Sequence, residues 1–225
     1  MVSKLSEKSI VIPGVIVADS SYTEGENTIK TDRGVVSTRL GIVSYAGKKV
    51  SVIPHSGPYK PRKGDFVIGL ITGYGPNGWL TDIGAITRAF LPVAEVIRRR
   101  RYDPRIQELS EILKIGEMIS VKVIEAGRLG YPILTMKDSG LQKITNARYV
   151  KVKVSKIPRI IGKKGSMLKL LKEGGKAKIF IGQNGVIAVI GSLDSYHKIV
   201  QAINLIVEKT FAHGLTSEVA ASLSS

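Results

Sequence analysis

The twelve residues Ile-Ile-Gly-Lys-Lys-Gly-Ser-Met-Leu-Lys-Leu-Leu, at positions 160–171, constrain the fold more than any other stretch. Two glycines bracket two lysines, and the apolar spacing that follows is typical of a helix. Glycine lets the backbone approach another group closely because it has no Cβ. A loop that ends where a helix begins presents unpaired N–H groups and the positive end of the helix dipole. The pattern therefore predicts a loop that binds an anion such as a phosphate.

The distribution of charge points to a polyanion. The 225 residues include 34 lysines and arginines and 18 acids, a net charge of +16. Residues 141–225 carry 14 basic and 4 acidic groups, a net of +10. Between Arg148 and Lys178 there are 11 basic residues and one acid, Glu173. A solubilising lysine-rich surface is the alternative, but such a surface mixes both signs, so we favour a nucleic-acid partner.

Several other classes of function find little support. The chain has no cysteine, and its three histidines lie far apart, so we expect no disulfide, thiol catalysis or metal centre. The acids form no close cluster, and we expect no enzymatic activity and no cofactor. Residues 73–78 fit Gly-x-Gly-x-x-Gly, but a strand pattern follows them instead of a helix. A polar N-terminus and the absence of a long apolar run predict a cytoplasmic protein.

The pattern of strands and helices predicts a multidomain α+β protein. Residues 1–58 read as a small β domain with strands at 10–17, 35–45 and 50–53. Residues 59–140 read as a five-stranded barrel of the oligonucleotide-binding type, with strands near 65–72, 78–83, 89–91, 118–124 and 131–136. Residues 145–213 change to the order strand, helix, helix, strand, strand, helix, and residues 214–225 read as a flexible tail. Gly174 and Gly175 would end the helix that follows the Gly-Lys-Lys-Gly loop, and Ser192 can cap the long final helix.

The third segment and its Gly-Lys-Lys-Gly loop resemble a type I KH domain (βααββα), whose loop clamps the backbone of about four nucleotides. The second segment resembles an S1 domain. A small N-terminal β domain, an S1 barrel and a KH domain in this order are similar to the RNA-binding cap subunits of the archaeal exosome, the ribosomal RNA-processing protein 4 family.

The resemblance implies a function and a set of partners. Three non-catalytic caps would sit on a hexameric ring of ribonuclease PH-type subunits. Each cap would hold single-stranded RNA and feed its 3′ end into the ring for phosphate-dependent degradation. A preference for A-rich tails is implied by the resemblance alone.

The candidate RNA-binding residues follow from both arguments. Gly162 and Gly165 would shape the clamp, and Lys163 and Lys164 would contact phosphate. Further basic residues would form a basic track along the RNA. They lie on the third segment (Lys151, Lys153, Lys156, Arg159) and on the barrel (Lys63, Arg88, Arg98, Arg99, Arg100, Arg101). The arginine run could equally be a solvated helix end or a docking surface for an acidic subunit.

Two features of these segments carry structural expectations. Gly182, Asn184 and Gly185 read as a hairpin turn of type I′ that packs against the neighbouring barrel. At the positions where S1 domains often carry stacking aromatics, this chain has Asn77, Leu80 and Pro92. Tyr74, Trp79 and Phe90 are nearby but out of register, so we expect the barrel to act mainly through charge.

Two alternative functions stay open on the sequence. The chain could be a free-standing RNA-binding regulator, for example in translation, or a structural clamp whose RNA contact is incidental.

Overall fold

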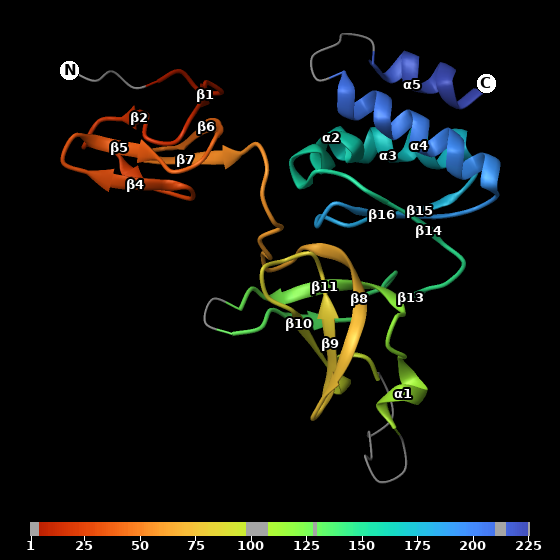
Figure 1. The fold of residues 1–225 in the computed structure, drawn as a ribbon. Helices are drawn as coiled ribbons and strands as arrows, with labels where there is room; N and C mark the ends of the chain where they lie inside the picture. Colours follow the sequence, from red (N-terminus) through yellow and green to blue (C-terminus); the bar gives the residue numbers. More distant parts are fainter. Residues whose placement is uncertain (1–4, 98–107, 128–129, 210–214, 225) are drawn as a thin grey trace. The chain divides into compact units, whose positions relative to one another are not determined.

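The computed structural model describes residues 5–97, 108–127, 130–209 and 215–224, and the chain divides into two compact units, residues 1–57 and 58–225 (Figure 1). Each unit is described by itself. No helix among the described residues is both long and apolar enough to cross a membrane.

The first unit is a small β domain with two sheets. One sheet has the order β1-β6-β7-β3 and the other β2-β5-β4. The strands are β1 (Ile10–Val11), β2 (Ile16–Ala18), β3 (Thr23–Glu24), β4 (Thr28–Thr31), β5 (Gly34–Ser37), β6 (Gly41–Ala46) and β7 (Lys49–Pro54). A core rich in valine includes Val11, Val43 and Val52. The two polar strands β3 and β4 are missing from the sequence prediction, because they offer no apolar alternation to find.

The outer face of the larger sheet carries a row of isoleucines. Ile10 is paired with Ile42, and Ile42 is paired with Ile53, across three adjacent strands. Their exposed fractions are 77%, 41% and 54%. Because residues in register on neighbouring strands share a face, the three side chains form one continuous apolar stripe on the surface.

The second unit begins with a closed five-stranded barrel. The pairing runs β12-β10-β9-β8-β11, and an additional β11–β12 pairing closes the ring. The strands are β8 (Phe66–Gly75), β9 (Gly78–Asp82), β10 (Ala89–Pro92), β11 (Met118–Glu125) and β12 (Ile133–Thr135). The short strand β13 (Lys143–Ile144) pairs antiparallel with β11. Two short helices, η1 (Val93–Glu95) and α1 (Leu109–Ile112), lie between β10 and β11 in the sequence. The predicted oligonucleotide-binding type of barrel is confirmed.

The rest of the second unit is a three-stranded sheet with helices on one face. The sheet order is β14-β16-β15, and both pairings are antiparallel. The elements are β14 (Arg148–Lys151), η2 (Val154–Lys156), α2 (Ile157–Ile161), η3 (Lys163–Gly165), α3 (Ser166–Gly175), β15 (Lys178–Ile181), β16 (Val186–Ile190), α4 (Leu193–Glu208) and α5 (Leu215–Ser224). The predicted βααββα order is confirmed. So is the helix cap at Ser192, whose Oγ accepts a hydrogen bond from the Ser195 N–H at 3.1 Å.

The C-terminal segment differs from its prediction. We expected a flexible tail after residue 214, but Leu215–Ser224 folds as α5 and buries Val219 and Leu223 in the helical core. The segment is rich in small and polar residues, and only two of its side chains pack in the core. Its sequence therefore shows no clear helical pattern of apolar residues.

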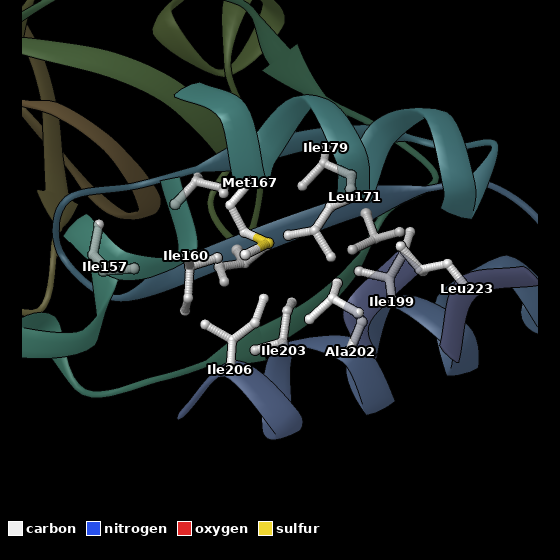
Figure 2. Close-up of a cluster of buried hydrophobic side chains, with 14 residues drawn as sticks. Ile157, Ile160, Met167, Leu171, Ile179, Ile199, Ala202, Ile203, Ile206 and Leu223 are labelled. Atoms are coloured by element: carbon white, nitrogen blue, oxygen red, sulfur yellow. The ribbon is translucent and has the colours of Figure 1, made fainter. Parts of the chain in front are cut away.

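Gly174 and Gly175 are the last two residues of α3, which ends at Gly175 as predicted. A Cβ on Gly175 would come within 2.5 Å of Ile199, and one on Gly174 within 2.8 Å of Leu223. The two glycines therefore permit close packing of α3 against α4 and α5. Figure 2 shows Ile199 and Leu223 side by side in the core that results.

Docking of α5 can be tested with Leu223→Ala. Leu223 is 3% exposed, and its truncation leaves a cavity against α3. We expect the free energy of unfolding to fall by about 2 kcal/mol. Urea unfolding followed by circular dichroism measures the change. Ser217→Ala, at an exposed position of the same helix, is the control, and equal stability of the two variants would show that α5 does not dock.

Candidate nucleic-acid interface

The Gly162–Gly165 loop has a backbone that only a few residues tolerate. Gly162 has φ of 75° and Gly165 has φ of 80°, both outside the region that L side chains favour. A Cβ on Gly162 would lie 2.7 Å from the backbone nitrogen of Met167. Lys164 lies between the glycines with φ of 54°, in the left-handed region. The loop ends at Gly165, and α3 begins at the next residue, Ser166.

The end of α3 that meets the loop is open to an anion. Its N-cap, Gly165, has no side chain to accept a hydrogen bond from the first N–H groups of the helix. Ile160, before the loop, and Met167, after it, are both anchored in the helical core (Figure 2). The loop is therefore held firmly at both ends, and the positive end of a ten-residue helix lies beside it.

Four predicted lysines carry charges that the protein does not neutralise. Lys151, Lys153, Lys163 and Lys164 are exposed, and their ammonium groups make no ion pair or hydrogen bond within the described ranges. Such uncommitted cations can contact phosphate without first breaking an internal interaction. The binding of RNA by these four lysines remains a prediction.

Two other predicted residues of the track have structural partners. The ammonium of Lys156 donates to the carbonyl of Val207 at 3.1 Å, and the guanidinium of Arg159 donates to the carbonyl of Lys209. Val207 is in the last turn of α4 and Lys209 is its C-cap, where backbone carbonyls need donors. The spacing of basic residues in the sequence could not reveal this helix-capping role.

The predicted cations of the barrel divide into two groups. Lys63 and Arg88 are exposed on loops of the barrel. Arg98, Arg99, Arg100 and Arg101 lie outside the described residues. Within the described ranges, no group of three or more histidines, aspartates or glutamates is arranged to hold a metal ion.

Trp79 and Phe90 lie on opposite sides of the barrel wall. Trp79 is fully buried, and its Nε1–H donates to the carbonyl of Leu113 at 3.0 Å. Phe90 is directly opposite Leu80 on the outer face and is half-buried. Its ring lies against the backbone of Gly75 and Gly78, where a Cβ would come within about 3.1 Å of the ring. Strands β9 and β10 thus place Phe90 and Leu80 next to each other on this face.

The loop at 182–185 docks the three-stranded sheet onto the barrel. The Gly185 N–H donates to the carbonyl of Gly182 at 3.0 Å, and Gly185 has φ of 87°. Asn184 does not have a positive φ, so the predicted type I′ pair is wrong. The turn instead presents the Asn184 side chain to the barrel.

Asn184 is bound on both of its amide atoms. Its Nδ2 donates to the carbonyls of Ile68 at 2.7 Å and Ile83 at 3.0 Å, and its Oδ1 accepts from the Ile68 N–H at 3.3 Å. The neighbouring Gln183 exchanges two hydrogen bonds of 2.8 Å with the backbone of Phe66. Asn184 is 4% exposed, so these bonds are shielded from water. A small cluster that includes Ile68, Ile144 and Ala188 seals the contact.

The comparisons with known domains fit this geometry. Residues 60–137 match the S1 RNA binding domain, and residues 147–207 match the KH domain. The fold and the site therefore define a class of proteins in which an S1 RNA binding domain is followed by a KH domain.

Relatives of nearly full length then fix the family. An exosome complex component Rrp4 of Methanothermus fervidus is 35% identical over 96% of this chain and 95% of its own length. One of Methanobrevibacter smithii is 34% identical over 98% of this chain and 72% of its own. A crystal structure assigned to an exosome complex RNA-binding protein is 34% identical, with a TM-score of 0.67, and covers 74% of this chain and 95% of the other. This chain belongs to the exosome complex component Rrp4 family.

The docking loop can be tested with Asn184→Ala. The variant leaves the carbonyl of Ile83 and both backbone groups of Ile68 without their partner. We expect a loss of about 1–3 kcal/mol in the free energy of unfolding, because unsatisfied buried polar groups carry a desolvation cost. Denaturant titration measures it. Gln183→Ala is the matched control, since water can replace the exposed Gln183 side chain. A loss no larger than that of the control would contradict the role of Asn184.

Proposed function

We propose that this chain is a non-catalytic RNA-binding subunit of the archaeal exosome. It captures single-stranded RNA and feeds the 3′ end into a phosphorolytic ring of ribonuclease PH-type subunits, with three copies on each ring. It acts in the cytoplasm. Three functional domains, at residues 1–58, 59–140 and 145–213, divide the work. Membership of the Rrp4 family, whose relatives are named as exosome complex components, supports the assembly.

The observation that carries RNA binding is the pair of uncommitted lysines in the Gly162–Gly165 loop. Lys163 and Lys164 project from a backbone that glycines hold open beside the positive end of α3. A phosphate placed there gains the favourable end of the helix dipole and two ammonium groups together. These contacts hold the backbone of any sequence, so a preference for A-rich tails must come from the bases. We place that preference in the contacts that the KH domain and Phe90 of the barrel make with the bases.

Docking on the ring has a candidate surface in the first unit. The stripe of Ile10, Ile42 and Ile53 offers no charge or aromatic face to RNA, and all three side chains are substantially exposed. Contiguous exposed apolar surface of this kind marks protein–protein contacts. We assign the stripe to the contact with the ring subunits.

The clamp is tested by replacing Lys163 and Lys164 with alanine together. We expect weaker binding to single-stranded RNA of any sequence, because phosphate contacts carry no sequence information. The slope of log K against log salt should shrink by about 1.4, or about 0.7 for each lost phosphate contact. Fluorescence anisotropy across a salt series measures both. An unchanged slope would remove the loop from RNA binding and favour a purely structural clamp.

The place of the chain in an exosome is tested with Ile42→Lys. A charge in the middle of the stripe should abolish co-elution with a ribonuclease PH-type hexamer in gel filtration, because an interface cannot bury it unpaired. RNA binding should be unchanged. Ile29→Lys, at a 56% exposed position on the other sheet, is the control.

The same samples separate the remaining functions. The wild-type chain should speed RNA decay by the ring and degrade nothing alone. Failure of the wild-type chain to co-elute with the hexamer would favour a free-standing RNA-binding regulator.

A further inference from the structure

The contact between the barrel and the KH domain gathers basic side chains from both partners. On the barrel side, Lys63 lies three residues before Phe66, whose N–H and C=O are both bonded to Gln183. On the KH side, the Val152 N–H donates to the carbonyl of Gly185 at 2.8 Å, and Lys151 and Lys153 flank Val152. The loop at 182–185 is therefore bonded to the barrel three residues after Lys63, and to the KH domain at Val152, between Lys151 and Lys153. We call this line of contact the seam.

Strand β14 carries its side of the seam at an open edge. It pairs only with β16 among the described strands, as the first strand in the sheet order β14-β16-β15. Tyr149 is opposite Ala188, and Lys151 is opposite Val186. Ala188 and Val186 belong to the cluster that packs on Ile68 of the barrel. Tyr149 and Lys151 therefore emerge on the barrel-facing side of the sheet, immediately beside the contact.

Val154 fixes the next part of the chain against the barrel. Its side chain packs on the buried cluster that fills the barrel. It also lies close to Gly185, where a Cβ would be 3.6 Å from Val154 Cγ2. Because Lys153 directly precedes this anchored residue, its backbone is held at the seam, and its side chain is exposed.

The charge at the seam is not neutralised from within. Lys63, Lys151 and Lys153 make no ion pair in the part of the chain that the structure describes. The nearest acid in sequence to Lys63 is Asp65, whose Oδ2 already accepts hydrogen bonds from the Tyr59 hydroxyl and the Arg62 N–H. Three cations are thus left for an external anion.

Tyr149 adds an aromatic surface to these charges. It is 37% exposed and two residues from Lys151 on the same face of β14. Partial burial raises the pKa of its phenol, so the ring stays neutral beside phosphate. Cations that track a backbone next to an aromatic ring are the recurring features of sites for single-stranded nucleic acid.

We propose that one strand of RNA crosses from the barrel to the KH domain along this seam, with phosphates on Lys63, Lys151 and Lys153 and a base stacked on Tyr149. This inference rests on the proposed RNA-binding function and names its path. It makes the two domains one composite site, because the docking loop fixes the distance between their charges. Binding at the second domain then becomes intramolecular once the first is occupied.

The experiment measures the salt dependence of binding to an oligouridylate of about twelve nucleotides, within the range that barrels of this type bind. If one strand crosses the seam, Lys63→Ala should reduce the slope by about 0.7 and the double change Lys151→Ala with Lys153→Ala by about 1.4. The triple variant should lose about 2.1, because every contact falls on the same molecule of RNA. Lys30→Ala, an exposed lysine of the first unit, should leave the slope unchanged.

Tyr149 has a separate readout. Tyr149→Leu should weaken binding by about fivefold or more, since stacking contributes about 1–3 kcal/mol per base, and it should leave the slope unchanged. Tyr149→Phe should retain wild-type affinity, because the ring and not the hydroxyl stacks. Thermal unfolding of both variants shows whether the fold is intact. Equal losses of affinity in the two variants would remove the stacking contact.

The outcomes separate this inference from the function on which it rests. No binding of the oligouridylate by the wild-type chain would overturn the RNA-binding function itself. If the wild-type chain binds but the salt slope is unchanged in the Lys63 variant or in the Lys151 and Lys153 double variant, the RNA-binding function stands and the crossing path is overturned. A triple variant that binds RNA no more weakly than the better-binding of its two parent variants would also overturn the crossing path.

Discussion

The side-chain amide of Asn184 is the interaction on which the arrangement of the second unit depends. It binds the backbone of Ile68 and Ile83 as a neighbouring strand would, and Gln183 repeats the contact at Phe66. A backbone in a barrel wall has few spare hydrogen-bonding groups, so these bonds specify one position along β8. A purely apolar contact could slide, because dispersion and burial have no direction. The polar loop supplies the register, and the apolar cluster around Ala188 supplies area.

The core of the KH domain depends on close packing between helices, since residues of α2, α3, α4 and α5 share one core with a three-stranded sheet. Gly174 and Gly175 let α3 approach α4 and α5 closely, and Ile160, Leu171 and Ile203 fill the space beneath (Figure 2). The same packing anchors Ile160 before the loop and Met167 after it. The position of the lysines therefore follows from the hydrophobic core, which holds fixed the two residues that the loop must join.

The sequence predicted what short-range physics decides. Alternation of apolar residues located the barrel strands, the Ser192 cap located α4, and the glycines around Lys163 and Lys164 located the loop. It failed where a distant partner decides. The carbonyls that bind Lys156 and Arg159 lie about fifty residues away in the sequence, and α5 packs on α3 and α4.

Lys164 illustrates how binding and stability compete at one residue. Its φ of 54° is a conformation that glycine adopts freely, whereas a residue with a Cβ loses roughly 1–2 kcal/mol there. Selection for a sturdier fold alone would favour glycine or asparagine at this position. The chain instead has a long cationic side chain at a backbone conformation that disfavours any residue with a Cβ. The free energy of unfolding of the domain is therefore lower than it could be, and in return one positive charge is held at the tip of the turn.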